Sequence, residues 1–200
     1  MPVVYPGATL TPHFGDFLPE WVARQSWYRG SGVPSLRMIG AFRFEDPAGE
    51  VGIETHLVDD GTTLYQVPMT YRGAALVSSA LIATTEHSVL GTRWIYDGIT
   101  DPVWAAQLIR LVVDEGVCGP SNKRGAADAQ AHGLLRRPHA SVPSIAMTID
   151  LRRVLSVGPV PDEPGIVGVA MGSWQPADSP PDSHVHGCLA VVRELTRRRP

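Results

Sequence analysis

The run from Thr85 to Trp104 constrains the fold most, because it combines the patterns of a strand, a turn and a helix start. Consecutive side chains between residues 89 and 96 would point to opposite faces of a half-buried strand. The Asp97-Gly98 pair then predicts a turn. Asp101-Pro102 suits a helix start, since the carboxylate accepts backbone N–H groups and proline at the first helical position gives up no needed donor. We therefore expect a strand that leads through a turn into a helix.

Three segments, in the same order along the chain, carry a resemblance to a known family. They are Gln25-Ser-Trp-Tyr28, Tyr65-Gln-Val-Pro-Met-Thr-Tyr-Arg72 and Glu86-His-Ser-Val-Leu-Gly-Thr-Arg-Trp-Ile-Tyr-Asp-Gly98. Together they resemble the N-terminal cap domain of actinobacterial maltokinases, over roughly residues 10–116. The resemblance implies a cystatin-like topology. It also predicts a stand-alone cap-like protein, because a full maltokinase carries a much larger kinase-like domain after its cap.

Length and composition are compatible with one domain over residues 1–200, since 44% of the residues are hydrophobic. The net charge of -3 gives no electrostatic reason to expect nucleic acid or an anionic membrane as partner. The basic ending from Arg193 to Arg199 is the exception, and we expect it to be a solvated tail. Two cysteines, no secretory leader and no apolar run long enough to span a bilayer predict a protein of the cytoplasm.

The periodicity along the chain predicts an α+β fold, in which a curved antiparallel sheet packs on one main helix. We expect that helix over residues 102–117, a short amphipathic helix over 17–28 and a mobile excursion at about 121–138. The expected strands cover residues 35–45, 51–59, 62–71, 86–96, 144–155, 166–171 and 184–193, the last closing the sheet.

The sequence carries no motif for phosphate binding or phosphoryl transfer. It has no Gly-x-x-x-x-Gly-Lys-Ser/Thr loop, no Gly-x-Gly-x-x-Gly turn, no His-x-Asp catalytic loop and no Gly-x-Ser-x-Gly nucleophile elbow. We therefore expect a non-catalytic protein without a cofactor.

A metal site is one interpretation of His184, His186 and Cys188, because the twofold period of a strand puts all three side chains on one face. A structural zinc site needs a fourth ligand, and no paired motif supplies one. The alternative is a polar sheet face with the Cys188 thiol turned into the core.

Two further groups are candidates for ligand or partner contacts. Glu54 and His56 share a strand face, so they could form an acid–base dyad or a hydrogen-bonded surface pair. Trp27, Tyr28 and Trp174 lie beside glycine and proline turns and could form an exposed aromatic patch. The other tryptophans, Trp21, Trp94 and Trp104, lie on periodic apolar stripes and are expected in the core.

The resulting hypothesis is a non-catalytic interaction or regulatory module linked to α-glucan and trehalose metabolism. By resemblance, its partner would be a kinase, trehalose synthase or another glucan enzyme, and self-association is a further way to cover an apolar patch. The alternative from another class is a sugar- or metal-binding protein or minor enzyme that uses the concave sheet face, with Glu54, His56 or the His184 group as polar contacts.

Overall fold

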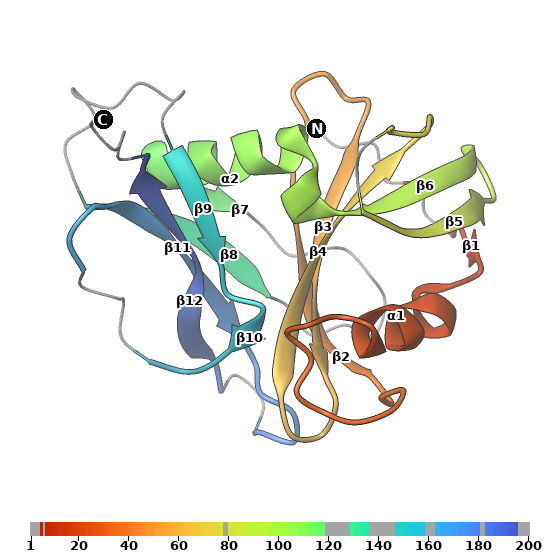
Figure 1. Ribbon diagram of the computed structural model, residues 1–200, viewed down its shortest axis with the longest axis horizontal. Coiled ribbons are helices and arrows are strands. Elements are labelled where there is room, and N and C mark those ends of the chain that lie inside the picture. Colours follow the sequence, from red (N-terminus) through yellow and green to blue (C-terminus); the bar gives the residue numbers. More distant parts are fainter. Residues whose placement is uncertain are drawn as a thin grey trace.

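A computed structural model describes residues 5, 7–77, 80–118, 129–136, 147–158, 163–180 and 183–195 of the chain. Within these residues, two antiparallel sheets and two α-helices form an α+β fold (Figure 1). One sheet is built mainly from the first half of the chain and the other from the second half.

The first sheet has the strand order β1-β5-β6-β4-β3-β2, and the short strand β10 also pairs with β4. Its strands are β1 Leu10–Thr11, β2 Arg37–Phe44, β3 Gly52–Asp59, β4 Leu64–Arg72, β5 Leu81–His87, β6 Gly91–Asp97 and β10 Val154–Leu155. Every pairing is antiparallel, as the short turns after Phe44 and Asp59 require. β4 is therefore an inner strand, with β3 along one side and β6 followed by β10 along the other.

The second sheet has the order β7-β8-β11-β12-β9. Its strands are β7 Val117–Cys118, β8 Gln130–Leu135, β9 Met147–Leu151, β11 Ile166–Trp174 and β12 Val185–Glu194. The register of β11 with β12 shifts between Ala170 and Met171, so Leu189 is an extra residue in β12 without a cross-strand partner. Such a bulge turns a carbonyl out of the ladder and makes it available to other groups.

Two α-helices cover different faces of the first sheet. α1 (Phe14–Ala23) begins at His13, whose ring accepts the Gly15 N–H, while Asp16 accepts the His13 N–H and completes a capping box. α2 (Pro102–Val113) follows the 3-10 turn η1 (Gly98–Thr100) and begins at Asp101, as predicted. In Figure 1, α2 runs from the first sheet towards the second, and α1 lies on the other side of the first sheet.

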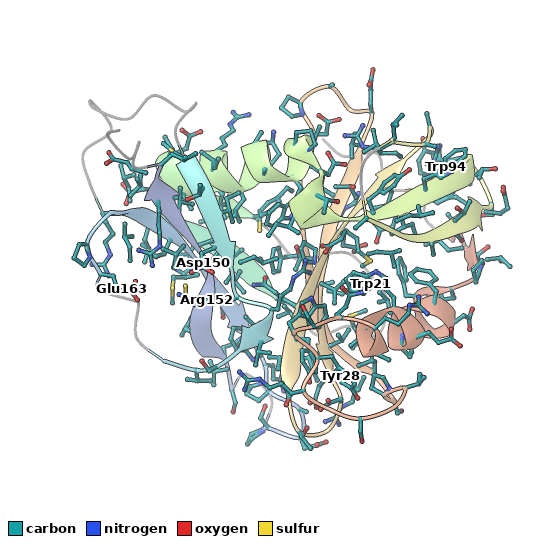
Figure 2. All side chains as sticks on the ribbon, viewed as in Figure 1. Trp21, Tyr28, Trp94, Asp150, Arg152 and Glu163 are labelled. Carbon is teal, nitrogen blue, oxygen red and sulfur yellow. The ribbon has the colours of Figure 1, made fainter. Side chains whose placement is uncertain are left out.

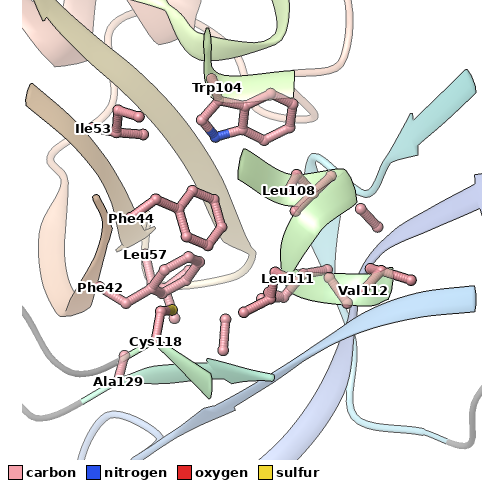
Figure 3. Close-up of a cluster of buried hydrophobic side chains, with 14 of the residues drawn as sticks. Phe42, Phe44, Ile53, Leu57, Trp104, Leu108, Leu111, Val112, Cys118 and Ala129 are labelled. Atoms are coloured by element: carbon pink, nitrogen blue, oxygen red, sulfur yellow. The ribbon is translucent and has the colours of Figure 1, made fainter. Parts of the chain in front are cut away.

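The larger hydrophobic core lies between α2 and the two sheets. Phe42, Phe44 and Leu57 of the first sheet face Trp104 and Leu111 of α2 (Figure 3). On the second sheet, α2 approaches the backbone itself: a Cβ atom on Gly133 would lie 1.9 Å from the Leu111 carbonyl oxygen. A smaller core fills the space between α1 and the other face of the first sheet.

The prediction of a single sheet is wrong. Residues 184–193, expected to close that sheet, form β12 of the second one. The physical reason is the wide apolar stripe of α2, which is buried against both sheets. The alternation of a strand shows which residues face a core, but not which sheet the strand joins.

Three further expectations need correction. Residues 86–96 are not one strand, because a turn at 88–90 separates β5 from β6, and Gly91 adopts the positive φ of 69° that this turn needs. Residues 130–135, inside the expected excursion at 121–138, form β8. The main helix ends at Val113, four residues early. Residues 121–128 and 137–138 and the basic tail after residue 195 lie outside the described residues.

Candidate functional site

Asp101 lies at the base of α2 and is fully buried, with both carboxylate oxygens engaged. Arg72, at the end of β4, donates a hydrogen bond from Nε to Oδ2 and another from Nη2 to Oδ1, and each bond is 2.7 Å long. The Thr70 hydroxyl donates to Oδ2 at a distance of 2.7 Å, and the Val103 N–H donates to Oδ1 at a distance of 3.0 Å. Burial alone would raise the pKa of Asp101, but the hydrogen bonds from Arg72, Thr70 and Val103 outweigh it and lower the pKa below its ordinary value. This ion pair anchors α2 to β4.

Asp97, four residues earlier, forms a second buried ion pair that is less complete. Its Oδ2 accepts one hydrogen bond, 2.5 Å long, from Nη2 of Arg153. Arg153 immediately precedes β10. The Arg153 guanidinium lies over the ring of Trp27, 5.2 Å from its centroid. Asp97 Oδ1 and Arg153 Nη1 are both shielded from solvent and have no hydrogen-bond partner among the described residues. The pair therefore retains unused hydrogen-bonding capacity.

Gln66 lies beside this pair on β4 and connects the two sheets. Its Nε2 donates over 2.5 Å to the carbonyl oxygens of Arg152 and of Leu189, the bulged residue of β12. Its backbone N–H donates to the Arg153 carbonyl over 2.9 Å. At this point the chain passes from β9 of the second sheet to β10 of the first. Gln66, Asp97 and Trp27 thus hold the crossing segment against β4.

Glu54 and His56 do share a strand face and do meet, as predicted. His56 Nε2 lies 3.4 Å from Glu54 Oε2, and the Tyr71 hydroxyl donates to the same oxygen over 3.1 Å. The expectation of a surface pair is wrong, because both residues are buried and the ring of Phe14 from α1 packs on His56. Burial, followed by the nearby Glu54 carboxylate, raises the pKa of Tyr71 well above its ordinary value.

The predicted aromatic patch is not formed as expected. Trp174 is only 2% exposed and belongs to the larger core, so its expected exposure is wrong. The turn residues beside it misled the prediction, because β11 continues to Trp174 itself. Trp27 and Tyr28 are half-buried and pack on Tyr65. Among the expected core tryptophans, Trp94 is the exception, since it is only partly buried on the β5–β6 hairpin (Figure 2).

The metal hypothesis for His184, His186 and Cys188 remains a prediction. His184 and His186 are exposed, and the half-buried Cys188 thiol lies 3.6 Å from the Ala190 carbonyl oxygen. Burial raises the pKa of that thiol, although the neighbouring Arg152 opposes the shift. In the part of the chain that the structure describes, no three His, Cys, Asp or Glu side chains are grouped to hold a metal ion.

Exposed apolar side chains mark the β5–β6 hairpin and the segments that adjoin it. Val89 and Leu90 form the turn of the hairpin, while Val77, Leu81 and Ile99 lie near its other end. Leu81 is the first residue of β5, whereas Val77 and Ile99 lie in the segments that precede and follow the hairpin. The Ala80 carbonyl accepts the Asp97 N–H and the Ala80 N–H donates to Thr100, which connects these two segments.

Residues 21–101 match the model of the maltokinase N-terminal cap domain family. The match covers 81 of the 200 residues, so this part of the chain is similar to a maltokinase N-terminal cap domain. We call residues 21–101 the cap segment. A comparison with curated proteins finds no match to the chain.

The cap segment contains β2 to β6, whereas α2 and all strands of the second sheet follow it. Gln66, Asp97 and Trp27 therefore belong to the cap segment, and their partners Arg152, Arg153 and Leu189 do not. The sequence predicts no contact for Gln66, and for Asp97 it predicts only a turn with Gly98. The available signal was their place in the Tyr-Gln-Val-Pro and Tyr-Asp-Gly segments that carry the family resemblance. Among the described helices, none has the length and apolarity needed to cross a membrane.

Proposed function

We propose that the chain is a non-catalytic module of the cytoplasm whose cap segment binds a protein partner, namely a kinase, trehalose synthase or another enzyme of α-glucan metabolism. The observation that carries the proposal is the set of exposed apolar side chains at the two ends of the β5–β6 hairpin: Val89 and Leu90 at its turn, and Val77, Leu81 and Ile99 at its other end. All five residues lie in the cap segment. Apolar side chains that gather on one exposed element are typical of a protein–protein contact.

The geometry favours a partner over a small ligand. Glu54 and His56, the polar groups considered for a ligand site, lie under α1 in contact with Phe14 and Tyr71. Trp174 is part of the core. The buried ion pairs at Asp97 and Asp101 join structural elements to one another. Glu54, His56 and the two aspartates thus have structural contacts, while apolar side chains at both ends of the hairpin are exposed to solvent.

The test is direct binding between the purified chain and purified maltokinase, trehalose synthase and other glucan enzymes of the same organism. Val77→Asp and Val89→Asp alter one exposed position at each end of the hairpin. Val157→Asp is the matched control, because Val157 is also exposed but lies outside the cap segment. We expect one enzyme to bind with defined stoichiometry and the two hairpin variants to weaken binding about tenfold, since a charge would be desolvated at the contact.

Calorimetry gives the affinity and light scattering gives the mass of the complex. If none of these enzymes binds, or if Val157→Asp weakens binding as much as the hairpin variants, the proposal is wrong. A homodimer that the hairpin variants dissociate would instead assign the surface to self-association and would also contradict it.

A further inference from the structure

Two strands from different parts of the chain pair with the edge of β4 that lies opposite β3. β6 covers it from Met69 to Arg72, and β6 belongs to the cap segment. β10 covers Leu64 and Tyr65, and β10 comes from the second half of the chain. The cap segment by itself therefore leaves one stretch of β4 edge open. In this chain a two-residue strand occupies it.

The residues around this stretch recognise more than a backbone. We call Trp27, Tyr65, Gln66 and Asp97 the β4 slot, and Arg152–Leu155 the strap. Tyr65 pairs with Val154, and the Gln66 N–H and side-chain amide donate to the carbonyl oxygens of Arg153 and Arg152. Asp97 accepts from the Arg153 guanidinium, which also lies over Trp27. The slot thus combines a strand edge with a carboxylate and an aromatic face that both suit an arginine.

The strap leaves one hydrogen-bond acceptor of the slot without a partner among the described residues. Asp97 Oδ1 and Arg153 Nη1 are buried without a hydrogen-bond partner among the described residues, although the Asp97 side chain is only 8% exposed. A buried carboxylate oxygen and a buried guanidinium N–H that remain unsatisfied make the pairing less favourable than a complete one. The strap pairs with β4 over only two residues, so few ladder hydrogen bonds oppose its release.

We propose that the β4 slot is a docking site for an extended segment of a partner protein in which an arginine precedes two β-forming apolar residues, and that the strap occupies this site in cis. The mode of binding is the addition of a strand to a sheet edge, with main-chain hydrogen bonds for affinity and side-chain contacts for specificity. The charge complementarity between Asp97 and the arginine selects the partner. The strap therefore competes with the partner, and its release controls access.

This inference is independent of the proposed function, because the slot and the β5–β6 hairpin are different surfaces and are altered by different substitutions. A partner that binds the hairpin need not enter the slot. Failure of the experiment below would leave the hairpin test unaffected, and failure of the hairpin test would leave the slot intact.

The experiment measures binding of a synthetic peptide with the sequence of residues 150–157 to the full-length chain. In the variant Arg153→Ala/Val154→Gly the strap loses its guanidinium and its β-branched side chain, which weakens the cis contact. We expect the peptide to bind this variant one to one and to bind the unaltered chain at least about tenfold more weakly. A peptide with alanine in place of the arginine that corresponds to Arg153 should lose about tenfold in affinity.

Arg152 provides the matched control, because its guanidinium pairs with Asp150 on the second sheet rather than with the slot (Figure 2). A peptide altered at the arginine that corresponds to Arg152 should bind as well as the original peptide. Adding Asp97→Asn to the variant should remove the preference for arginine at the Arg153 position. Equal binding of the three peptides, or no binding to a variant whose circular dichroism shows a folded protein, would overturn the proposal.

Light scattering and hydrogen exchange complete the test. A variant that dimerises and excludes the peptide would show that the slot takes the strap of a second copy, which also overturns the proposed occupant. In the unaltered chain, backbone amides of residues 152–155 should exchange at least about tenfold faster than those of residues 189–192 in β12, because release of the strap does not require global unfolding. Exchange of both segments at the same rate, under conditions limited by global unfolding, would contradict a separable strap.

Discussion

Asp97 and Asp101 lie four residues apart, both are buried, and both pair with an arginine, yet their surroundings differ. Asp101 accepts from two nitrogens of Arg72, from Thr70 and from the Val103 N–H, so both its oxygens are engaged. Asp97 accepts from Arg153 through Oδ2, and its Oδ1 has no partner among the described residues.

The difference follows from where the partners come from. Arg72 and Thr70 are on β4, which already packs beside the start of α2, so local structure places all donors around Asp101. Arg153 arrives from the second half of the chain, at the crossing between the two sheets. The comparison teaches that the first ion pair lies within the cap segment, whereas the second joins the cap segment to the later part of the chain.

Asp101→Ala should have the largest effect on stability. It removes the helix cap and leaves the Arg72 guanidinium beside a buried site without its carboxylate, so we expect a loss of about 4 kcal/mol in the free energy of unfolding. Urea denaturation followed by circular dichroism measures it, and Asp114→Ala, which removes an exposed ion pair with Arg110 at the other end of α2, is the control. A loss below about 1 kcal/mol would break the comparison, because it would make the complete pair no more important than a surface one.

Asp97→Ala should cost about 2 kcal/mol, less than Asp101→Ala, because one carboxylate oxygen is already unsatisfied and the Arg153 guanidinium keeps its contact with Trp27. The same denaturation experiment measures it. A cost equal to that of Asp101→Ala would show that the two pairs contribute alike and that the missing hydrogen bonds have no energetic consequence.

Double-mutant cycles sharpen the comparison by isolating each pair. The cycle of Arg72→Met with Asp101→Asn should give a coupling energy of about 2 kcal/mol, and that of Arg153→Met with Asp97→Asn about 1 kcal/mol, since the first pair is bidentate. Stabilities of the single and double variants supply both values. The reverse order would contradict the assignment of the weaker contact to the junction.

The smallest expected effect is that of Asp101→Asn on how the free energy of unfolding depends on pH in acid. The folded state lowers the pKa of Asp101, so its contribution is complete above the unfolded pKa of about 3.9 and is lost as the pH falls towards the lower folded value. Stability measured between about pH 5 and pH 2 should therefore fall less steeply in Asp101→Asn than in the unaltered chain. An unchanged slope would mean that Asp101 releases no additional protons on folding.

Local patterns predicted the parts of the molecule whose determinants are close in sequence. Asp101-Pro102 indicated the helix start, and the twofold period placed Glu54 and His56 on one face. The contacts of Gln66 could not be predicted in this way, because its partner Leu189 is 123 residues away and offers its carbonyl only where a bulge interrupts the register of β12. The second sheet escaped prediction for a related reason, since periodicity does not say which strands pair.

The hydrogen bond from Gln66 to Leu189 also bears on the order in which the chain folds during synthesis. The chain emerges from the exit tunnel of the ribosome with its N-terminus first, so β4 emerges long before β10 and β12. Until then, the open stretch of β4 is an unpaired strand edge, and such edges are where nascent chains associate with one another. This edge of the nascent cap segment is thus exposed to aggregation until β10 has been made.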